Sequence, residues 1–163
     1  MAVELYKLDG RMLHGQVLST FGRILNPDEF IVVNEKVAKD DSERVVLEIA
    51  VPGDADFDCV SPKTYAKIFQ ENDYYGTKTF VVFRYITDVV EAVEAGAQIP
   101  YLNAAGFYQN PKSELPQTNY GVNLWITEED KKHLRWLEDH GVKLTYKVSH
   151  MTPEEPLNKY VKY

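Results

Sequence analysis

Short apolar runs alternate with longer amphipathic stretches along the chain. Apolar runs of four to six residues bounded by turn residues are typical of buried strands, whereas apolar residues that recur at helical spacing indicate helices. The alternation predicts an α/β fold, in which a mainly parallel, open and twisted sheet of about seven strands is covered by helices on both faces. We expect a single domain over residues 1–163, because no linker or internal repeat interrupts the pattern.

The pattern places each element approximately. The helix that follows residue 41, for example, is predicted because Val45, Val46 and Ile49 recur at helical spacing. We expect strands over residues 3–8, 30–33, 56–60, 79–83, 100–104, 121–125 and 142–148, and helices over 15–24, 42–50, 62–71, 88–95 and 128–140.

Helix-start and helix-stop residues support these boundaries. Ser61, Thr87 and Thr127 are each expected to cap the helix that follows. Gly96 is expected to end the helix before it. By contrast, residues 106–119 are polar and contain two prolines, so we expect a loop there. The tail from residue 152 also contains two prolines, and we expect it to be loosely packed.

Composition narrows the class of protein. The net charge is −7 and no basic stripe is visible, which argues against a nucleic-acid partner. Cys59 is the single cysteine, so no internal disulfide can form, and we expect it to be a small buried residue. The N-terminus lacks the apolar core of a signal peptide, and no run approaches the ~20 apolar residues of a membrane span. These features predict a cytoplasmic protein.

The candidate chemistry lies in residues 7–17, at the carboxyl end of the first predicted strand. Ligands bind at this edge of open parallel sheets. His14 can act as a nucleophile, and Arg11 could neutralise a phosphoryl group held on it. The backbone N–H groups of Gly15 and Gln16, at the start of the predicted helix, are candidates for phosphate binding.

Each of these roles has a simpler alternative. Asp9 could orient the His14 ring by accepting its proton, or it could merely form the turn after the strand. His14 itself could be a loop histidine that caps the helix. Gly10 and Gly15 have the spacing of a Walker A loop, but Gln16 and Val17 replace its Lys-Ser/Thr pair.

The segment Arg11-Met12-Leu13-His14-Gly15-Gln16-Val17 resembles the Arg-Leu-Ile-His-Gly-Gln-Val signature of one family. This family comprises the IIB components of the mannose/fructose/sorbose class of the bacterial sugar phosphotransferase system (PTS). Further collinear segments resemble the same family, namely residues 31–38, 81–84, 94–100, 102–107, 127–130 and 138–142.

The resemblance implies that His14 accepts a phosphoryl group from a phosphohistidine on a IIA component. The group then passes to a sugar bound by the membrane IIC/IID components, so that the protein is associated with the inner face of the membrane. No metal or organic cofactor is expected. Family members are often found as dimers or in larger complexes, and both ring nitrogens of His14 remain candidates for the phosphoryl group.

The sequence departs from the family pattern at three places. Gly10 stands where the family usually has a second acidic residue, which leaves Asp9 as the one acidic neighbour in the loop. Ala104-Ala105 replaces Val-Gly, which puts in doubt any backbone contact that depends on that glycine. Residues 150–153 follow the family's Val-Pro-Thr-Asp ending only loosely.

Two residues at the same predicted sheet edge are weaker phosphate-binding candidates. Arg84 could supply a second cation, but helix capping or pairing with Asp88 is the favoured alternative. Asn103 could shape the site, and turn formation is an equal alternative. His133 and His140 lie seven residues apart with no third ligand at suitable spacing, so no metal site is expected.

Three functions fit these residues. The first is a IIB phosphoryl carrier, which the retained nucleophile and Arg11 favour. The second is a non-catalytic regulatory or binding module on the same fold. The third is a small phosphatase, for which the loop offers no general base beyond Asp9.

Overall fold

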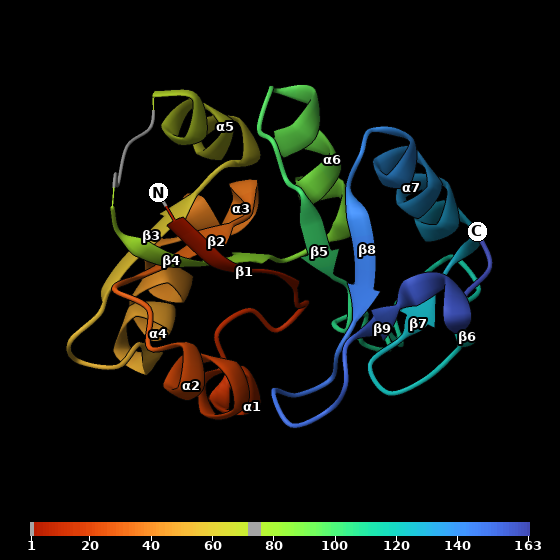
Figure 1. The fold of residues 1–163 in the computed structure, drawn as a ribbon, viewed down its shortest axis with the longest axis horizontal. Helices are drawn as coiled ribbons and strands as arrows, with labels where there is room; N and C mark the ends of the chain where they lie inside the picture. The colour runs from red at the N-terminus through yellow and green to blue at the C-terminus, as the bar shows by residue number, and fades with distance from the viewer. Residues whose placement is uncertain (1, 72–75) are drawn as a thin grey trace.

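The computed structural model describes residues 2–71 and 76–163, and it contains a seven-stranded sheet with helices on both faces (Figure 1). The strands are β1 (Ala2–Leu8), β2 (Glu29–Val33), β3 (Asp56–Val60), β4 (Lys78–Phe83), β5 (Tyr101–Asn103), β8 (Lys143–Tyr146) and β9 (Glu155–Pro156). Their order is β3-β2-β4-β1-β5-β8-β9, with parallel pairing throughout except between β8 and β9. The predicted fold class is confirmed.

The five predicted helices are present, and the described residues contain two further short helical segments where none was predicted. A continuous helical stretch after β1 consists of α1 (Gly15–Val17), a π-helical turn (Leu18–Gly22) and α2 (Arg23–Leu25). The others are α3 (Glu35–Ala38), α4 (Asp41–Ala50), α5 (Pro62–Glu71), α6 (Ile86–Glu94), α7 (Glu128–Asp139) and a 3-10 turn (Leu157–Lys159). Among the helices of residues 2–71 and 76–163, none has the length and apolar character needed to cross a bilayer.

The sheet separates two hydrophobic clusters. In Figure 1, α5, α6 and α7 lie above the sheet, and α1, α2 and α4 lie below it. The upper cluster includes Tyr65, Val89 and Leu134 from those helices, and the lower one includes Phe21 and Leu47. Alternate residues of each central strand enter opposite clusters, as the two-residue period of a strand requires. This two-sided burial fixes the sheet and therefore its carboxyl edge, where the candidate residues lie.

Most predicted helix ends are confirmed, and one is wrong. Ser61 Oγ accepts a hydrogen bond from Thr64 N, and Thr127 Oγ1 accepts one from Asp130 N. Gly96 ends its helix in the left-handed region, with φ +104°. Thr87, however, lies inside α6, which begins at Ile86. The reason is that the first-turn carboxylate, that of Asp88, accepts the backbone N–H of the residue before the helix.

Two further expectations need correction. The tail is not loosely packed, because Leu157 and Val161 are fully buried and β9 pairs with β8. Residues 121–125 form little strand; instead β6 (Thr118–Asn119) and β7 (Trp125–Ile126) make a short antiparallel pair, and β6 lies in the segment expected to be loop. The helix α4 is confirmed; within it Val45, Val46 and Ile49 are exposed and Leu47 is buried.

Candidate functional site

The candidate residues lie at the carboxyl edge of the sheet, where the loops after neighbouring strands lead to opposite faces. β1 lies between β4 and β5, and the helical stretch after β1 covers the opposite face from α6, which follows β4. The loops that leave these strands therefore separate above and below the sheet. Such a switch point leaves a crevice, which is where ligands bind in open α/β sheets.

The loop after β1 is a tight turn with one strained residue. Met12 N donates to Asp9 O at 2.9 Å, which closes the turn. Met12 has φ +58°, an uncommon conformation for a residue with a Cβ, and its buried side chain belongs to the lower cluster. Burial of this side chain holds the unfavourable backbone conformation in place and brings His14 to the start of α1.

His14 and Asp9 form the centre of the site. His14 Nε2 lies 3.2 Å from both carboxylate oxygens of Asp9, whose side chain is buried. Asp9 also accepts the backbone N–H of Arg11 at 2.9 Å, so it both forms the turn and binds the imidazole. His14 occupies the position before α1 but makes no side-chain capping bond. The geometry therefore fits an oriented imidazole better than a helix cap.

The contacts of His14 leave one ring nitrogen available. Within the described part of the chain, Nδ1 makes no hydrogen bond, whereas Nε2 faces Asp9. An ionised carboxylate accepts hydrogen bonds and donates none, so it favours the tautomer with the proton on Nε2. In this tautomer, the lone pair that can attack an electrophile is on Nδ1.

Lys7 is a member of the site that the sequence analysis left without a role. Its ammonium is buried at the end of β1, donates to Ala105 O at 2.9 Å and lies 3.5 Å from Asp9 Oδ2. Burial lowers the pKa of Lys7, and the neighbouring Asp9 carboxylate opposes this effect. The one signal in the sequence was a lysine between Tyr6 and Leu8 near the end of a predicted strand, where a buried unpaired charge would be costly.

Tyr108 is the second residue that sequence reasoning missed. Its hydroxyl donates to Asp9 Oδ2 at 3.2 Å and lies at the same distance from His14 Nε2. The guanidinium carbon of Arg11 lies 4.1 Å from the centre of the Tyr108 ring, within the range of a cation–π contact. Because Tyr108 lies 94 residues from His14 in the sequence, no local motif could have indicated this contact.

The turn after β5 comes very close to β1. A Cβ on Gly106 would lie 2.0 Å from Leu8 O and 2.6 Å from Asp9 Cα, so only glycine fits there. The adjacent Ala104 and Ala105, which depart from the family pattern, are buried without such a conflict. The close backbone contact between this turn and β1 therefore depends on Gly106, and it is compatible with alanine at positions 104 and 105.

The predicted phosphate-binding backbone is placed beside His14. Gly15 and Gln16 are exposed at the start of α1. The first backbone N–H groups of a helix have no partner within the helix, and they carry partial positive charge. They are therefore suitable donors for a phosphoryl oxygen, with Arg11 exposed in the preceding turn.

Arg84 lies on the same edge, but it neither caps a helix nor pairs with Asp88. It forms an ion pair with Glu43 at 3.2 Å, whereas the Asp88 carboxylate binds Asn34. The expected pairing of Arg84 with Asp88 is therefore wrong. Arg84 and Arg11 both border a cavity of about 610 Å³, so a second cation is near the site.

Asn103 has a structural place at the end of β5. Its side chain is fully buried, and it donates to Lys147 O and accepts from the backbone N–H groups of Ala105 and Lys147. These bonds connect the ends of β5 and β8, as the turn-forming alternative expected. The side chain stabilises the backbone beneath the site, and its polar atoms have protein partners.

Cys59 has no features of a reactive thiol. It is buried in β3 within the lower cluster, and burial raises its pKa to about 11. A thiol with such a raised pKa is protonated near neutral pH and is a poor nucleophile.

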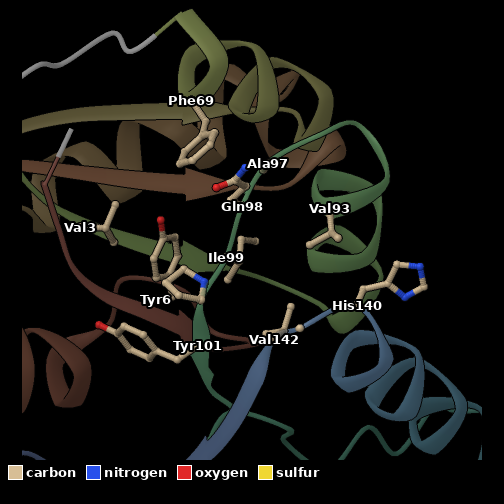
Figure 2. A pocket seen from close by; sticks show the side chains of 12 residues that line it. Val3, Tyr6, Phe69, Val93, Ala97, Gln98, Ile99, Tyr101, His140 and Val142 are labelled. Carbon is tan, nitrogen blue, oxygen red and sulfur yellow. The ribbon is translucent and has the colours of Figure 1, made fainter.

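A second hollow lies at the opposite edge of the sheet, away from His14. Its volume is about 510 Å³, and Figure 2 shows the largely apolar side chains that surround it, including Val3, Phe69 and Val142. It lies where β1, β5 and β8 begin rather than end. This hollow is therefore separate from the candidate site.

Comparison with known proteins agrees with the geometry. The family model described as the PTS system sorbose subfamily IIB component matches residues 3–163. The chain belongs to this family. It is therefore a IIB phosphoryl carrier of the mannose/sorbose class and a component of a sugar phosphotransferase. A IIB component works with IIA and IIC/IID partners.

Individual relatives of this IIB component agree with the assignment. It is 29% identical over 145 residues to the fructose-specific EIIB component of Bacillus subtilis, covering 88% of this chain and 86% of the relative. It is also 29% identical to the sorbose-specific EIIB component of Klebsiella pneumoniae, covering 91% and 88%. The crystal structure of the IIBSor domain of the Klebsiella pneumoniae sorbose permease superposes with a TM-score of 0.87 at 26% identity, covering 98% and 96%.

Proposed function

We propose that His14 carries the phosphoryl group in this IIB component, taking it from a phosphohistidine of the IIA partner. The group then passes to a sugar that enters through the membrane IIC/IID components. The observation that carries the proposal is the contact of His14 Nε2 with the buried Asp9 carboxylate, which leaves Nδ1 as the attacking atom. In this proposal, residues 1–163 act as one domain at the inner face of the membrane.

The transfer step requires one bond to form and one to break. The Nδ1 lone pair attacks phosphorus, and the bond between phosphorus and the donor's ring nitrogen breaks. The proton on Nε2 stays in place, so the His14 ring gains positive charge as the new bond forms. Asp9, 3.2 Å from Nε2, stabilises this charge.

The neighbouring donors act on the phosphoryl oxygens. Arg11 is exposed one turn before His14 and can neutralise charge on the transferred group. The backbone N–H groups of Gly15 and Gln16 provide further donors at the start of the helix. Positioning and charge neutralisation supply most of the catalysis in phosphoryl transfer, and these groups supply both.

The experiment is phosphoryl uptake from the general PTS proteins and a mannose-class IIA component. Intact-mass spectrometry at neutral or alkaline pH would compare wild type, His14→Ala and His150→Ala, the last a partly exposed histidine outside the site. We expect wild type and His150→Ala to gain one acid-labile phosphoryl group and His14→Ala to gain none.

Two results would contradict the proposal. If His14→Ala gains the group, another residue is the acceptor. If wild type gains none from a IIA component that phosphorylates another mannose-class IIB, His14 is not an acceptor, and the protein is a binding module on the same fold.

A further inference from the structure

The phenol of Tyr108 joins the three groups that the proposed transfer uses. Its hydroxyl lies 3.2 Å from Asp9 Oδ2 and 3.2 Å from His14 Nε2. Its ring meets the His14 ring edge-on, with centres 6.1 Å apart, and lies beneath the Arg11 guanidinium at 4.1 Å. One side chain from the loop after β5 therefore contacts the nucleophile, its carboxylate partner and the nearby cation.

The direction of the hydrogen bonds follows from the acceptors present. Burial and the nearby Asp9 carboxylate raise the pKa of Tyr108, so the phenol keeps its proton. A carboxylate is a stronger acceptor than a neutral ring nitrogen, so the hydroxyl donates to Asp9. The phenol oxygen can then accept the Nε2–H of His14, which Asp9 also faces.

We propose that Tyr108 is a positioning residue that holds the His14 imidazole with its proton on Nε2 and its lone pair on Nδ1. It acts through two contacts, a donor to Asp9 and an acceptor for Nε2–H. The same ring limits the movement of the Arg11 side chain from below. This role rests on the proposed function of His14, since the orientation matters because Nδ1 is the attacking atom.

The Tyr108 ring packs against the loop that follows β1. A Cβ on Gly10 would lie 3.4 Å from Tyr108 Cδ2, an ordinary van der Waals distance, so the ring packs directly against the turn. The Gly10 amide also donates to Gly106 O at 3.0 Å, which connects the β1 loop to the turn that carries Tyr108. Tyr108 therefore follows a turn that is hydrogen-bonded to the β1 loop.

The first test reads the imidazole directly and needs no phosphoryl donor. ¹⁵N NMR of the histidine rings would give the ratio of the two neutral tautomers of His14 in wild type, Tyr108→Phe and Tyr101→Phe. Tyr101 is a matched control, because its hydroxyl donates to Glu4 O at 3.0 Å on the opposite edge of the sheet. We expect Tyr108→Phe to raise the share of the Nδ1–H tautomer by about two- to tenfold, because the hydrogen bond from Nε2–H to the phenol oxygen is lost.

The second test separates the hydroxyl from the ring. Tyr108→Phe keeps the aromatic contact with Arg11, whereas Tyr108→Leu removes it too, so we expect phosphoryl uptake to slow about tenfold in the first and further in the second. An unchanged tautomer ratio in folded Tyr108→Phe would overturn the role of Tyr108. Failure of wild type to take up the group would instead contradict the function of His14, and the tautomer ratio would still test Tyr108.

Discussion

At the scale of single residues, the site depends on one buried carboxylate. Asp9 is almost inaccessible to solvent and is contacted by Lys7, the Arg11 amide, His14 and Tyr108. A buried charge is tolerated when several donors satisfy it. The same donors fix the direction of its oxygens, so Asp9 can hold the imidazole in one orientation.

Substitution of Asp9 by Asn tests this orientation. The side chain keeps its shape, but its NH₂ group donates, so a contact with Nε2 favours the proton on Nδ1 and blocks the attacking atom. We expect phosphoryl uptake to fall by roughly 10²- to 10⁴-fold, as when a carboxylate that orients a catalytic histidine becomes an amide. Initial rates of uptake by intact mass would measure the loss, with circular dichroism to show that the variant folds.

A rate for Asp9→Asn within about twofold of wild type would contradict this prediction, because the orientation of the ring would then not depend on the charge. Glu4→Gln is a suitable control, since it removes an exposed carboxylate from the first strand without touching the site.

The residues of the site differ in how far the sequence could indicate them. His14, Arg11 and Asp9 share one short segment, so their spacing and the resemblance to a known signature were sufficient. Lys7 lies beside that segment, but whether a strand lysine is buried depends on what packs over it, here Phe21 and the Ala105 carbonyl. Tyr108 enters from a distant loop, and only the fold brings it to His14.

At the scale of elements, the pattern located helices and strands better than it located their faces. Apolar runs identified β2 and β4 because both are buried on two sides. In α4 the stripe of Val45, Val46 and Ile49 predicted a helix correctly but not its orientation, since these side chains lie outward. Periodicity shows that one face is apolar, and it does not show which neighbour covers that face.

The C-terminal tail shows the same limit. The tail carries two prolines, which argue against regular structure, yet Leu157 and Val161 fill space beside the sheet and are fully buried. Burial of two apolar side chains stabilises the tail by about 3–6 kcal/mol before the entropy cost of ordering it. The sequence showed the prolines but not the space that the tail fills.

The turn after β5 provides a prediction at this scale. Gly106→Ala would place a Cβ 2.0 Å from the Leu8 carbonyl oxygen, and neither backbone can yield without moving the Asp9 loop. We expect the free energy of unfolding to fall by roughly 2–4 kcal/mol, typical of a strained backbone contact. Urea unfolding would measure it. Gly53→Ala is the control, because no atom lies within 4 Å of a Cβ there, and an equal loss in both variants would contradict the prediction.

At the scale of the whole molecule, the sheet order explains why three distant loops make one site. The strand that bears the His14 loop lies between β4 and β5, so Arg84 and Tyr108 are brought to its two sides. A coarse α/β prediction places all these residues on one edge of the sheet. The order of the strands then decides which loops lie next to the His14 loop. That order follows from packing over the entire sheet, which local patterns do not contain.

Two buried carboxyl groups make the stability of the molecule depend on pH. Burial raises the pKa of Glu29, at the start of β2, to about 7, and the nearby Asp56 and Asp58 charges contribute. Burial also raises the pKa of Asp88 to about 6, opposed by its hydrogen bonds from Asn34 and Tyr85 N. Both groups bind protons more tightly in the folded protein than in the unfolded chain, so folding is favoured at the lower pH.

The sign of the effect can be tested with Glu29. As pH rises from 4.5 through about 7, the unfolded chain has already lost this proton while the folded protein loses it late, so the free energy of unfolding falls over that window. Glu29→Gln stays neutral and should remove this part of the decline, which makes it more stable than wild type at pH 8 by about 1–3 kcal/mol. Urea unfolding at pH 5, 6, 7 and 8 would show the two curves separating as pH rises. Asp54→Asn, which neutralises an exposed carboxylate in the nearby turn, should keep the wild-type slope, and a Glu29→Gln curve parallel to wild type would show that Glu29 is not the responsible group.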